Sequence, residues 1–437
     1  MTWSELSFEA ESPVPIYRQL YERLAGWIRA GHLPDGSRLL PTRELAGLLG
    51  LNRTTVSAAY EALETDGLLK AHVGRGSFVC APAVSAAFDW ESHFRSPAPD
   101  RALHNLAFAA GEESISFVSS RPDPEIFPIE AVRRAAEQEL TQRGSAILQL
   151  GAAEGYGPLR EWLAARMRQS GILRDGDELL ITTGCQQGLD LVAKILVPAG
   201  ETVLLEDPVY PGARDLFLAA GAQVRGVGVG PAGVSLSELE HELSRHRPGL
   251  LVVTPNFQNP TGASLPLEGR RELLRLAARF QVAIVENDVY AGLRYRGAEA
   301  ASQTALDADG RVIYLSSFSK MAFPGLRVGW SVAPRAVVRR LAAAKQLADL
   351  HTDQLSQAVL YRLAVDGVLA EHLREVVRHG AARLEAIVES CRAGMPPGVR
   401  FEPPQGGMHV WLELPAPLDA DELLARARAE KVVFLPG

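Results

Sequence analysis

Lys320 is the residue whose type and setting first suggest chemistry. It ends the run Ser316-Ser-Phe-Ser-Lys320, which follows a short apolar stretch, 312–315, expected to be a buried strand. A lysine just past a buried strand is held away from bulk water. Desolvation lowers its pKa and makes its amine a nucleophile toward an aldehyde. The lysine of a Ser-Lys pair taken at random is usually a solvated surface residue. The residues around Lys320 must therefore distinguish a desolvated nucleophile from a surface lysine.

Several groups near Lys320 in the expected fold could hold a phosphate. Arg327, seven residues further along, offers a guanidinium fork, and Ser317 offers a hydroxyl. The segment 183–187 joins an expected strand to a helix expected over 188–196. N–H groups at a helix N-terminus bind phosphate, but this signal is weak when taken alone. The family resemblance described below implies Gly184, Cys185 and Gln186 as the phosphate contacts of this segment.

Polar residues that suit an aromatic, nitrogen-containing cofactor end two other expected strands. Asp288 could pair with a protonated pyridine nitrogen and keep the ring an electron sink, and Tyr290 could hydrogen-bond to a phenolic oxygen. Asn259 lies in Asn256-Phe-Gln-Asn259-Pro-Thr-Gly262, after the strand expected from Leu250. Taken singly, a strand-end aspartate is often a cap for the next element, and Asn-Pro-Thr-Gly could be a plain turn.

The elements that must position these groups alternate between β-rich runs and helical stretches. This alternation predicts an α/β domain with a mostly parallel sheet. In such sheets ligands bind beyond the carboxyl ends of the strands, where the polar residues above are found. The expected strands are Glu178–Thr183, Thr202–Glu206, Leu250–Thr254, Val282–Glu286 and Val312–Ser316.

The first eighty residues have a different pattern: three helices followed by a hairpin. Apolar residues recur at helical spacing over 15–30, a short helix from about Leu40 ends at Gly50, and Asn52 is a suitable N-cap for a third helix reaching about Asp66. Two brief apolar strands then surround Gly74-Arg75-Gly76. The region is predicted to be an α+β winged helix-turn-helix.

Such a winged helix-turn-helix can read double-stranded DNA. The second helix of the pair enters the major groove with its N-terminal residues, here Arg53, Thr54 and Thr55. Arg43 could meet a backbone phosphate, and Arg75 at the wing tip could reach a minor groove. Basic residues outnumber acidic ones only five to four between positions 38 and 75, so by pattern alone a packing module remains the alternative.

Composition bounds the class of protein. The 437 residues are 47% apolar and 22% charged, with a formal charge of −7, which excludes a chain that coats nucleic acid along its whole surface. Three unpaired cysteines indicate neither a disulfide framework nor a metal site. The sequence shows no signal peptide and no apolar run near the roughly 18 residues that span a bilayer. We expect a cytoplasmic protein with no membrane association, divided into a DNA-binding domain (1–80), a linker (81–113) and an α/β domain (114–437).

Two sets of motifs resemble known families. Pro15-Ile-Tyr-Arg-Gln-Leu20, Asn52-Arg-Thr-Thr-Val56 and Gly74-Arg-Gly-Ser-Phe-Val79 closely resemble the GntR-type winged helix. The Lys320 segment resembles the Schiff-base segment of fold-type I enzymes that use pyridoxal 5′-phosphate (PLP), and Phe-Gln-Asn-Pro-Thr-Gly resembles the aminoadipate-type aminotransferases. Together they resemble the MocR subfamily of GntR-type regulators.

This resemblance implies roles for individual residues. Lys320 would be the Schiff-base lysine, Asn259 and Tyr290 would contact the phenolic oxygen, and Tyr210 would stack on the ring. It also implies a homodimer, with the sites at the interface between subunits and the operator in two half-sites.

The chain departs from the family pattern at two places. It stops at Gly437, before the segment in which relatives carry an arginine for the substrate carboxylate, so either the sequence is truncated or that arginine is absent. Leu150 stands where relatives commonly have a tyrosine that reaches the partner's cofactor. Arg214 and Arg294 are other candidates for a carboxylate, although the sequence alone does not place them.

Three functions remain open at this stage. The first is a transcription regulator that senses an amine or amino acid through Lys320, binding promoter half-sites. The second is a working aminotransferase of the aminoadipate-type branch that carries a DNA-binding domain. The third is a regulator for which PLP itself is the signal. The complete DNA-reading module favours a regulator, because catalysis gains nothing from it.

Overall fold

The computed structural model describes residues 14–72, 75–80, 114–118 and 120–437, together with single residues 3, 6, 8, 9, 12 and 93. Two compact units divide the chain, Met1–Pro97 and Ala98–Gly437. The linker predicted over 81–113 lies outside the described residues, apart from residue 93, as does Gly74 of the predicted wing. Among the described residues no helix is long and apolar enough to cross a membrane.

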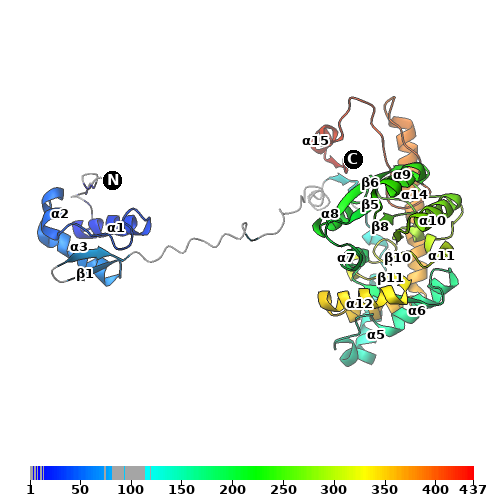
Figure 1. Cartoon of the computed structure of the whole chain (residues 1–437), viewed down its shortest axis with the longest axis horizontal. Coiled ribbons are helices and arrows are strands. Elements are labelled where there is room, and N and C mark those ends of the chain that lie inside the picture. The colour runs from blue at the N-terminus through cyan, green and yellow to red at the C-terminus, as the bar shows by residue number, and fades with distance from the viewer. Residues whose placement is uncertain are drawn as a thin grey trace. The chain divides into compact units, whose positions relative to one another are not determined.

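Within the described residues of the N-terminal unit, three α-helices precede an antiparallel hairpin (Figure 1). Leu20, Leu24 and Leu63 are fully buried where α1 and α3 pack together. Gly50 ends α2 with a φ of 66°, a left-handed conformation that glycine adopts without steric cost. Asn52 caps α3 by accepting a hydrogen bond from the Thr54 N–H. The elements are α1 (Ile16–Arg29), α2 (Thr42–Leu49), α3 (Arg53–Thr65), β1 (Leu69–His72) and β2 (Gly76–Val79).

An eight-stranded sheet forms the centre of the second unit, in the order β4-β11-β10-β9-β8-β5-β6-β7 (Figure 1). The pairs from β10 through β9, β8 and β5 to β6 are parallel, whereas β11 is antiparallel to both of its neighbours and β7 to β6. The carboxyl ends of β5, β8, β9 and β10 therefore share one edge of the sheet. The strands are β4 (Asp177–Thr182), β5 (Thr202–Asp207), β6 (Gln223–Gly230), β7 (Gly233–Val234), β8 (Leu250–Val253), β9 (Ala283–Asn287), β10 (Val312–Ser317) and β11 (Gly329–Pro334).

Both faces of the sheet are buried, as the nearly continuous apolar strands require. In β8, for example, Leu250 and Val252 join one core cluster while Leu251 and Val253 join another. The first cluster packs under α7 (Cys185–Leu196), α8 (Pro211–Ala219) and α12 (Arg335–Asp349). The second packs under α9 (Leu236–His246) and α10 (Leu267–Phe280). Helices α5 (Ile129–Ile147), α6 (Gly157–Gln169) and α13 (Gln354–Val365) cover a third cluster, on β4, β10 and β11.

The remaining elements are those of the C-terminal part of the unit, a strand near its start and several short helices. A long helix, α14, leads to α15 and to β12, which pairs in parallel with β3 near the start of the unit. This pairing brings residues 115–116 beside residues 432–433. The elements are β3 (Ile115–Ser116), α14 (Val368–Gly394), α15 (Ala420–Ala429) and β12 (Val432–Val433), with the short helices η3 (Pro124–Ile126), η4 (Ala291–Leu293), α11 (Gln303–Leu306) and η5 (Pro324–Leu326).

All five expected strands occur, within one or two residues of their predicted ends, as β4, β5, β8, β9 and β10. The helix expected from Gly188 begins instead at Cys185. Gly184, with a φ of 81°, makes the turn by itself, so helical backbone starts at the next residue and Cys185 and Gln186 belong to the first turn.

We predict that Leu24→Ala lowers the free energy of unfolding of the N-terminal unit by about 2–5 kcal/mol, because it empties a fully buried site between helices. Leu48→Ala on α2, where the side chain is 52% exposed, is the control and should change it by less than about 0.5 kcal/mol. Hydrogen exchange of peptides within residues 16–79 of the full chain measures both. Equal losses in the two variants would contradict this core.

Candidate functional site

Lys320 lies in the turn between β10 and β11 and its amine is directed toward the start of the second unit. Its Nζ donates a hydrogen bond of 2.8 Å to the carbonyl oxygen of Ser120. Burial, together with the positive charges of Arg121 and Arg327, lowers the pKa of Lys320 to about 8. About a tenth of the amine is therefore unprotonated at pH 7, far more than in an ordinary lysine, and the unprotonated amine is the nucleophile.

Asp288 lies just beyond the end of β9 and is only 3% exposed. Its Oδ1 accepts a hydrogen bond of 2.8 Å from Asn256 Nδ2, and its Oδ2 accepts one of 3.1 Å from the Tyr314 hydroxyl. Burial raises the pKa of Asp288, whereas the Asn256 bond, the charge of Arg270 and the Tyr314 bond oppose that rise. Asp288 is thus a carboxylate held in apolar surroundings by specific donors.

Tyr290 and Asn259 meet, although they come from different loops. Asn259 Nδ2 donates to the Tyr290 hydroxyl at 3.2 Å, and Tyr290 is 3% exposed. Burial raises the pKa of Tyr290, so its hydroxyl keeps its proton at neutral pH. The pair therefore offers O–H and N–H donors at one point beside Asp288 on the sheet edge.

Arg327 lies next to the start of α7. It adopts a left-handed φ of 54°, and its guanidinium donates to Ser319 Oγ at 3.2 Å and to the Thr183 carbonyl at 3.4 Å. A Cβ added at Gly184 would lie 2.6 Å from Arg327 Nη2, so only glycine lets the guanidinium approach this backbone. The N-cap position of α7 has no side-chain hydrogen bond. A cation and a helix N-terminus thus face the same place, which suits an anion.

Three of the predicted phosphate contacts are engaged elsewhere through their side chains. Ser317 Oγ bonds to the Val328 carbonyl and accepts from the Ser319 N–H within its own turn. The Cys185 thiol donates to Asn287 Oδ1 at 3.0 Å, and burial raises its pKa to about 12, so it is not a nucleophile. Gln186 Nε2 donates to the Gly212 carbonyl. The hydroxyl beside Arg327 is that of Ser319, which the sequence analysis did not select.

Tyr210 is the N-cap residue of α8 and is 41% exposed. Burial of its hydroxyl raises its pKa, and the charges of Cys185 and Arg327 also act on it. Tyr210 lies between β5 and α8, just beyond one of the strands whose carboxyl ends share this edge of the sheet.

Two residues of this region were missed by the sequence analysis, Ser120 and His409. His409 Nε2 and Ser120 Oγ are 2.9 Å apart, and the His409 ring meets the Tyr290 ring edge-on with centroids 5.3 Å apart. Burial, followed by the charge of Lys320, lowers the pKa of His409 to about 3, so the imidazole is neutral. They are 289 positions apart in sequence, and no local pattern signals their meeting.

The two arginines considered for a carboxylate are otherwise occupied. Arg294 donates to Gln405 Oε1 and to Asn256 Oδ1, and its guanidinium lies 4.8 Å from the centre of the Phe257 ring. Arg214 pairs with its neighbour Asp215. Leu150 is 76% exposed.

Among the described residues, no group of three or more His, Cys, Asp or Glu side chains could hold a metal ion.

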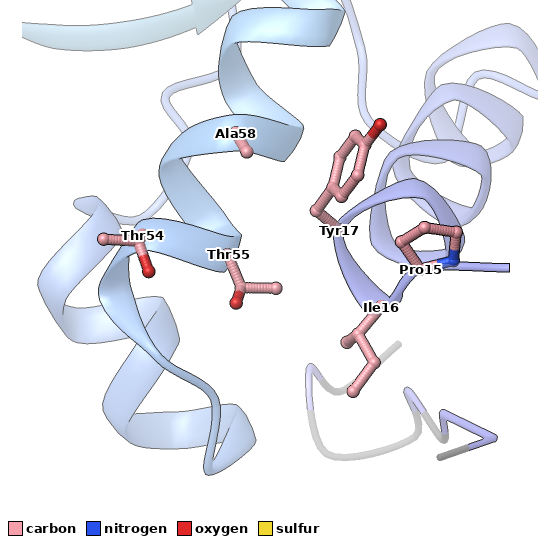
Figure 2. A pocket seen from close by; sticks show the side chains of 6 residues that line it. All are labelled: Pro15, Ile16, Tyr17, Thr54, Thr55 and Ala58. Carbon is pink, nitrogen blue, oxygen red and sulfur yellow. The ribbon is translucent and has the colours of Figure 1, made fainter. Parts of the chain in front are cut away.

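The candidate DNA-contacting residues lie on the surface of the N-terminal unit. Arg43, Arg53, Thr54 and Arg75 are exposed, and Thr55 is half-buried. Figure 2 shows Thr55 and Ala58 on the side of α3 toward Pro15, Ile16 and Tyr17 at the start of α1, with Thr54 beside them. These six residues line an open groove of about 410 Å³. The groove borders the exposed N-terminal residues of α3.

Known protein families match each of the two units separately. Residues 118–437 match the family of aminotransferase class I and II, and residues 16–79 match the bacterial regulatory proteins of the gntR family. A 2-aminoadipate transaminase of Thermus thermophilus is 40% identical over 330 residues, which are 74% of this chain and 81% of that protein. The probable rhizopine catabolism regulatory protein MocR of Rhizobium meliloti is 30% identical over 438 residues, 99% of this chain and 88% of that protein.

Solved structures resemble the second unit. Kynurenine aminotransferase of Pyrococcus horikoshii, determined in complex with PMP, KYN as substrates and KYA as products, is 31% identical. It superposes with a TM-score of 0.76 and covers 80% of this chain and 89% of its own.

We predict that Lys320 reacts with a small aldehyde at lower pH than an exposed lysine does. A pKa of about 8 leaves half of the Lys320 amine neutral at that pH, and the neutral fraction rises above it. Reductive methylation with formaldehyde across pH 6–10, followed by peptide mass spectrometry, measures this. The exposed Lys194 of α7 is the internal control. Identical pH profiles for the two lysines would contradict the lowered pKa.

Proposed function

Because the chain belongs to the aminotransferase class I and II family and carries a gntR-family domain ahead of it, we propose that it is a DNA-binding transcription regulator whose second unit binds PLP and senses an amine or amino acid. The MocR-like architecture and the fold class predicted from sequence are confirmed. The observation that carries the proposal is the match to the regulatory protein MocR along 99% of this chain.

The described residues fit PLP. The phosphate is an anion, and Arg327 with the uncapped start of α7 offers it a guanidinium and backbone N–H groups, beside Gly184, where an added Cβ would clash with that guanidinium. The ring needs an acceptor for its nitrogen and donors for its phenolic oxygen. Asp288 and the Asn259–Tyr290 pair are groups of these types, from strands that end at one sheet edge.

When bound, PLP supplies an aldehyde carbon open to attack by amines and a ring that accepts electron density. Lys320 provides the competing amine of the protein, made nucleophilic by its burial. Arg327 would orient the phosphate, and Asp288 would hold a proton on the ring nitrogen. An effector amine would compete with Lys320, and Lys320 released from the cofactor has the Ser120 carbonyl as a hydrogen-bond acceptor.

The N-terminal unit would read promoter DNA with α3 in the major groove, and Arg43 and Arg75 would contact the backbone and the adjacent groove. We expect a homodimer, because winged-helix operators are commonly repeated half-sites. An effector alters DNA binding only if the two arrangements of the protein differ in affinity for it.

A second candidate function is transamination. Its support is the 40% identity to a protein named as a 2-aminoadipate transaminase. Formation of keto acids from a panel of amino acids, with Lys320→Ala as the control, tests it. PLP as the sole signal is the third candidate, for which DNA affinity would change with PLP and not with any amine.

The experiment that tests the regulator uses fluorescence anisotropy with DNA from the region upstream of the protein's own coding sequence. We predict specific binding, and a change in affinity of about fivefold or more when PLP-loaded protein meets the correct amine from a panel. Lys320→Ala should bind the same DNA but not respond to the amine. Absence of sequence-specific binding under every condition would contradict the proposal.

We predict further that Arg53→Ala weakens specific binding by about 1–3 kcal/mol and relaxes selectivity for one position of the operator, because two hydrogen bonds from the guanidinium to a base are lost. Arg18→Ala on α1, which removes an exposed pair with Glu22, is the control and should bind like the parent protein. A uniform loss across all DNA sequences would instead assign Arg53 to the phosphate backbone.

A further inference from the structure

The side-chain amide of Asn256 is held in one orientation by two arginines. Asn256 is 4% exposed, and its Oδ1 accepts hydrogen bonds of 2.7 Å from Arg270 Nη2 and 3.2 Å from Arg294 Nη2. An amide oxygen with two cationic donors cannot exchange places with its nitrogen, since that would set N–H groups against guanidinium N–H groups. The Asn256 nitrogen is therefore committed to donate to Asp288 Oδ1, at 2.8 Å.

Arg270 of α10 is itself fixed. It is fully buried, and besides Asn256 its guanidinium donates to the carbonyl oxygens of Leu265 at 2.9 Å, Ala301 at 3.0 Å and Pro255 at 3.1 Å. These acceptors belong to three separate stretches of chain. Although burial lowers the pKa of Arg270, guanidinium groups keep their proton in proteins. A permanent positive charge is thus held one amide away from Asp288.

This charge opposes several groups that disfavour an ionised Asp288. Glu286, two residues earlier on β9, is fully buried, and burial together with the charge of Asp288 raises its pKa to about 7. Glu299 acts on Asp288 in the same direction, whereas the Tyr314 hydroxyl of β10 donates to it. The thiol of Cys185 on α7 also lies within range of the Asp288 charge and keeps its proton.

We propose that Arg270 and Asn256 are positioning residues that set the orientation and the negative charge of Asp288, and through it the protonation of the ring nitrogen of the bound cofactor. This inference rests on the cofactor of the proposed function. Arg270 on α10 and Asn256 in the loop after β8 would both act through Asp288 rather than by touching the cofactor.

Loss of the Asn256 donor changes the protonation of Asp288 first and, through it, that of the ring nitrogen. Without the Asn256 donor, the Asp288 carboxylate loses one of its two hydrogen bonds while Glu286 remains close, so Asp288 takes up a proton more readily. A neutral Asp288 no longer favours a proton on the ring nitrogen. The ring then carries less positive charge, and the rest of the cofactor retains its protons to higher pH.

Two variants test the proposal, each with a matched control. Asn256→Leu keeps the number of side-chain heavy atoms and removes both the donor to Asp288 and the acceptor of the two arginines. Gln357→Leu removes another buried amide, which is hydrogen-bonded to the backbone of Tyr156, Thr352 and Asp353. Arg270→Lys keeps the positive charge and loses the planar guanidinium with its several N–H donors. Its control, Arg311→Lys, makes the same change at an arginine that donates to Ala277 and Asp309. The readouts are the Kd of PLP for the cofactor-free protein and the pH midpoint of the absorbance change of bound PLP.

We expect Asn256→Leu to raise the Kd of PLP about tenfold and to move the absorbance midpoint upward by about one pH unit or more, corresponding to one pKa unit of lost charge stabilisation. Arg270→Lys should move the midpoint in the same direction by less. Both controls should leave the midpoint where the parent protein has it.

The outcomes separate this inference from the proposed function. Parent protein that binds no PLP overturns both. Parent protein that binds PLP, with an unshifted midpoint in Asn256→Leu, overturns only the positioning role, and so does an equal shift in Gln357→Leu. If Arg270→Lys fails to fold by circular dichroism, Asn256→Leu decides alone.

Discussion

The burial of the Asp288 carboxyl group, which is 3% exposed, is the constraint on which the candidate site of the second unit depends. Water cannot solvate Asp288, so the protein must supply donors in fixed positions, and it draws them from β10 and from the loop after β8. The buried guanidinium of Arg270, bonded to several backbone carbonyls, anchors one of these donors. The parallel arrangement of β8, β9 and β10 is what brings these groups to one edge.

The sheet edge alone does not complete the site. Lys320 is held through Ser120, near the start of the second unit, and Ser120 is held by His409, near its end. The pairing of β3 with β12 joins the same two regions again. The environment of the lysine therefore depends on the packing of the terminal parts of the unit onto the sheet, so a change at Lys320 and a change in that packing are physically linked.

The sequence predicted those parts of the structure that local chemistry determines. Five strands, the three N-terminal helices and the turns bearing Asp288, Asn259 and Lys320 follow from apolar runs, caps and glycines. Ser120, His409 and Arg270 could not be foreseen, because each acts through a contact with a residue far away in sequence. The choice of Ser317 over Ser319 depended on which hydroxyl a tight turn directs toward Arg327, and spacing does not reveal this. The antiparallel strand β11 was missed because its first residues belong to the motif that follows Lys320 and were therefore not considered as a strand.

The central claim is that a PLP-dependent site at Lys320 has been joined to a DNA-reading unit. The most direct measurement is borohydride reduction of the PLP-loaded protein followed by peptide mass spectrometry. We predict one phosphopyridoxyl group per chain, on the peptide that contains Lys320, and its loss when an amine effector is added before reduction. A label on another lysine, or no label at all, would contradict it.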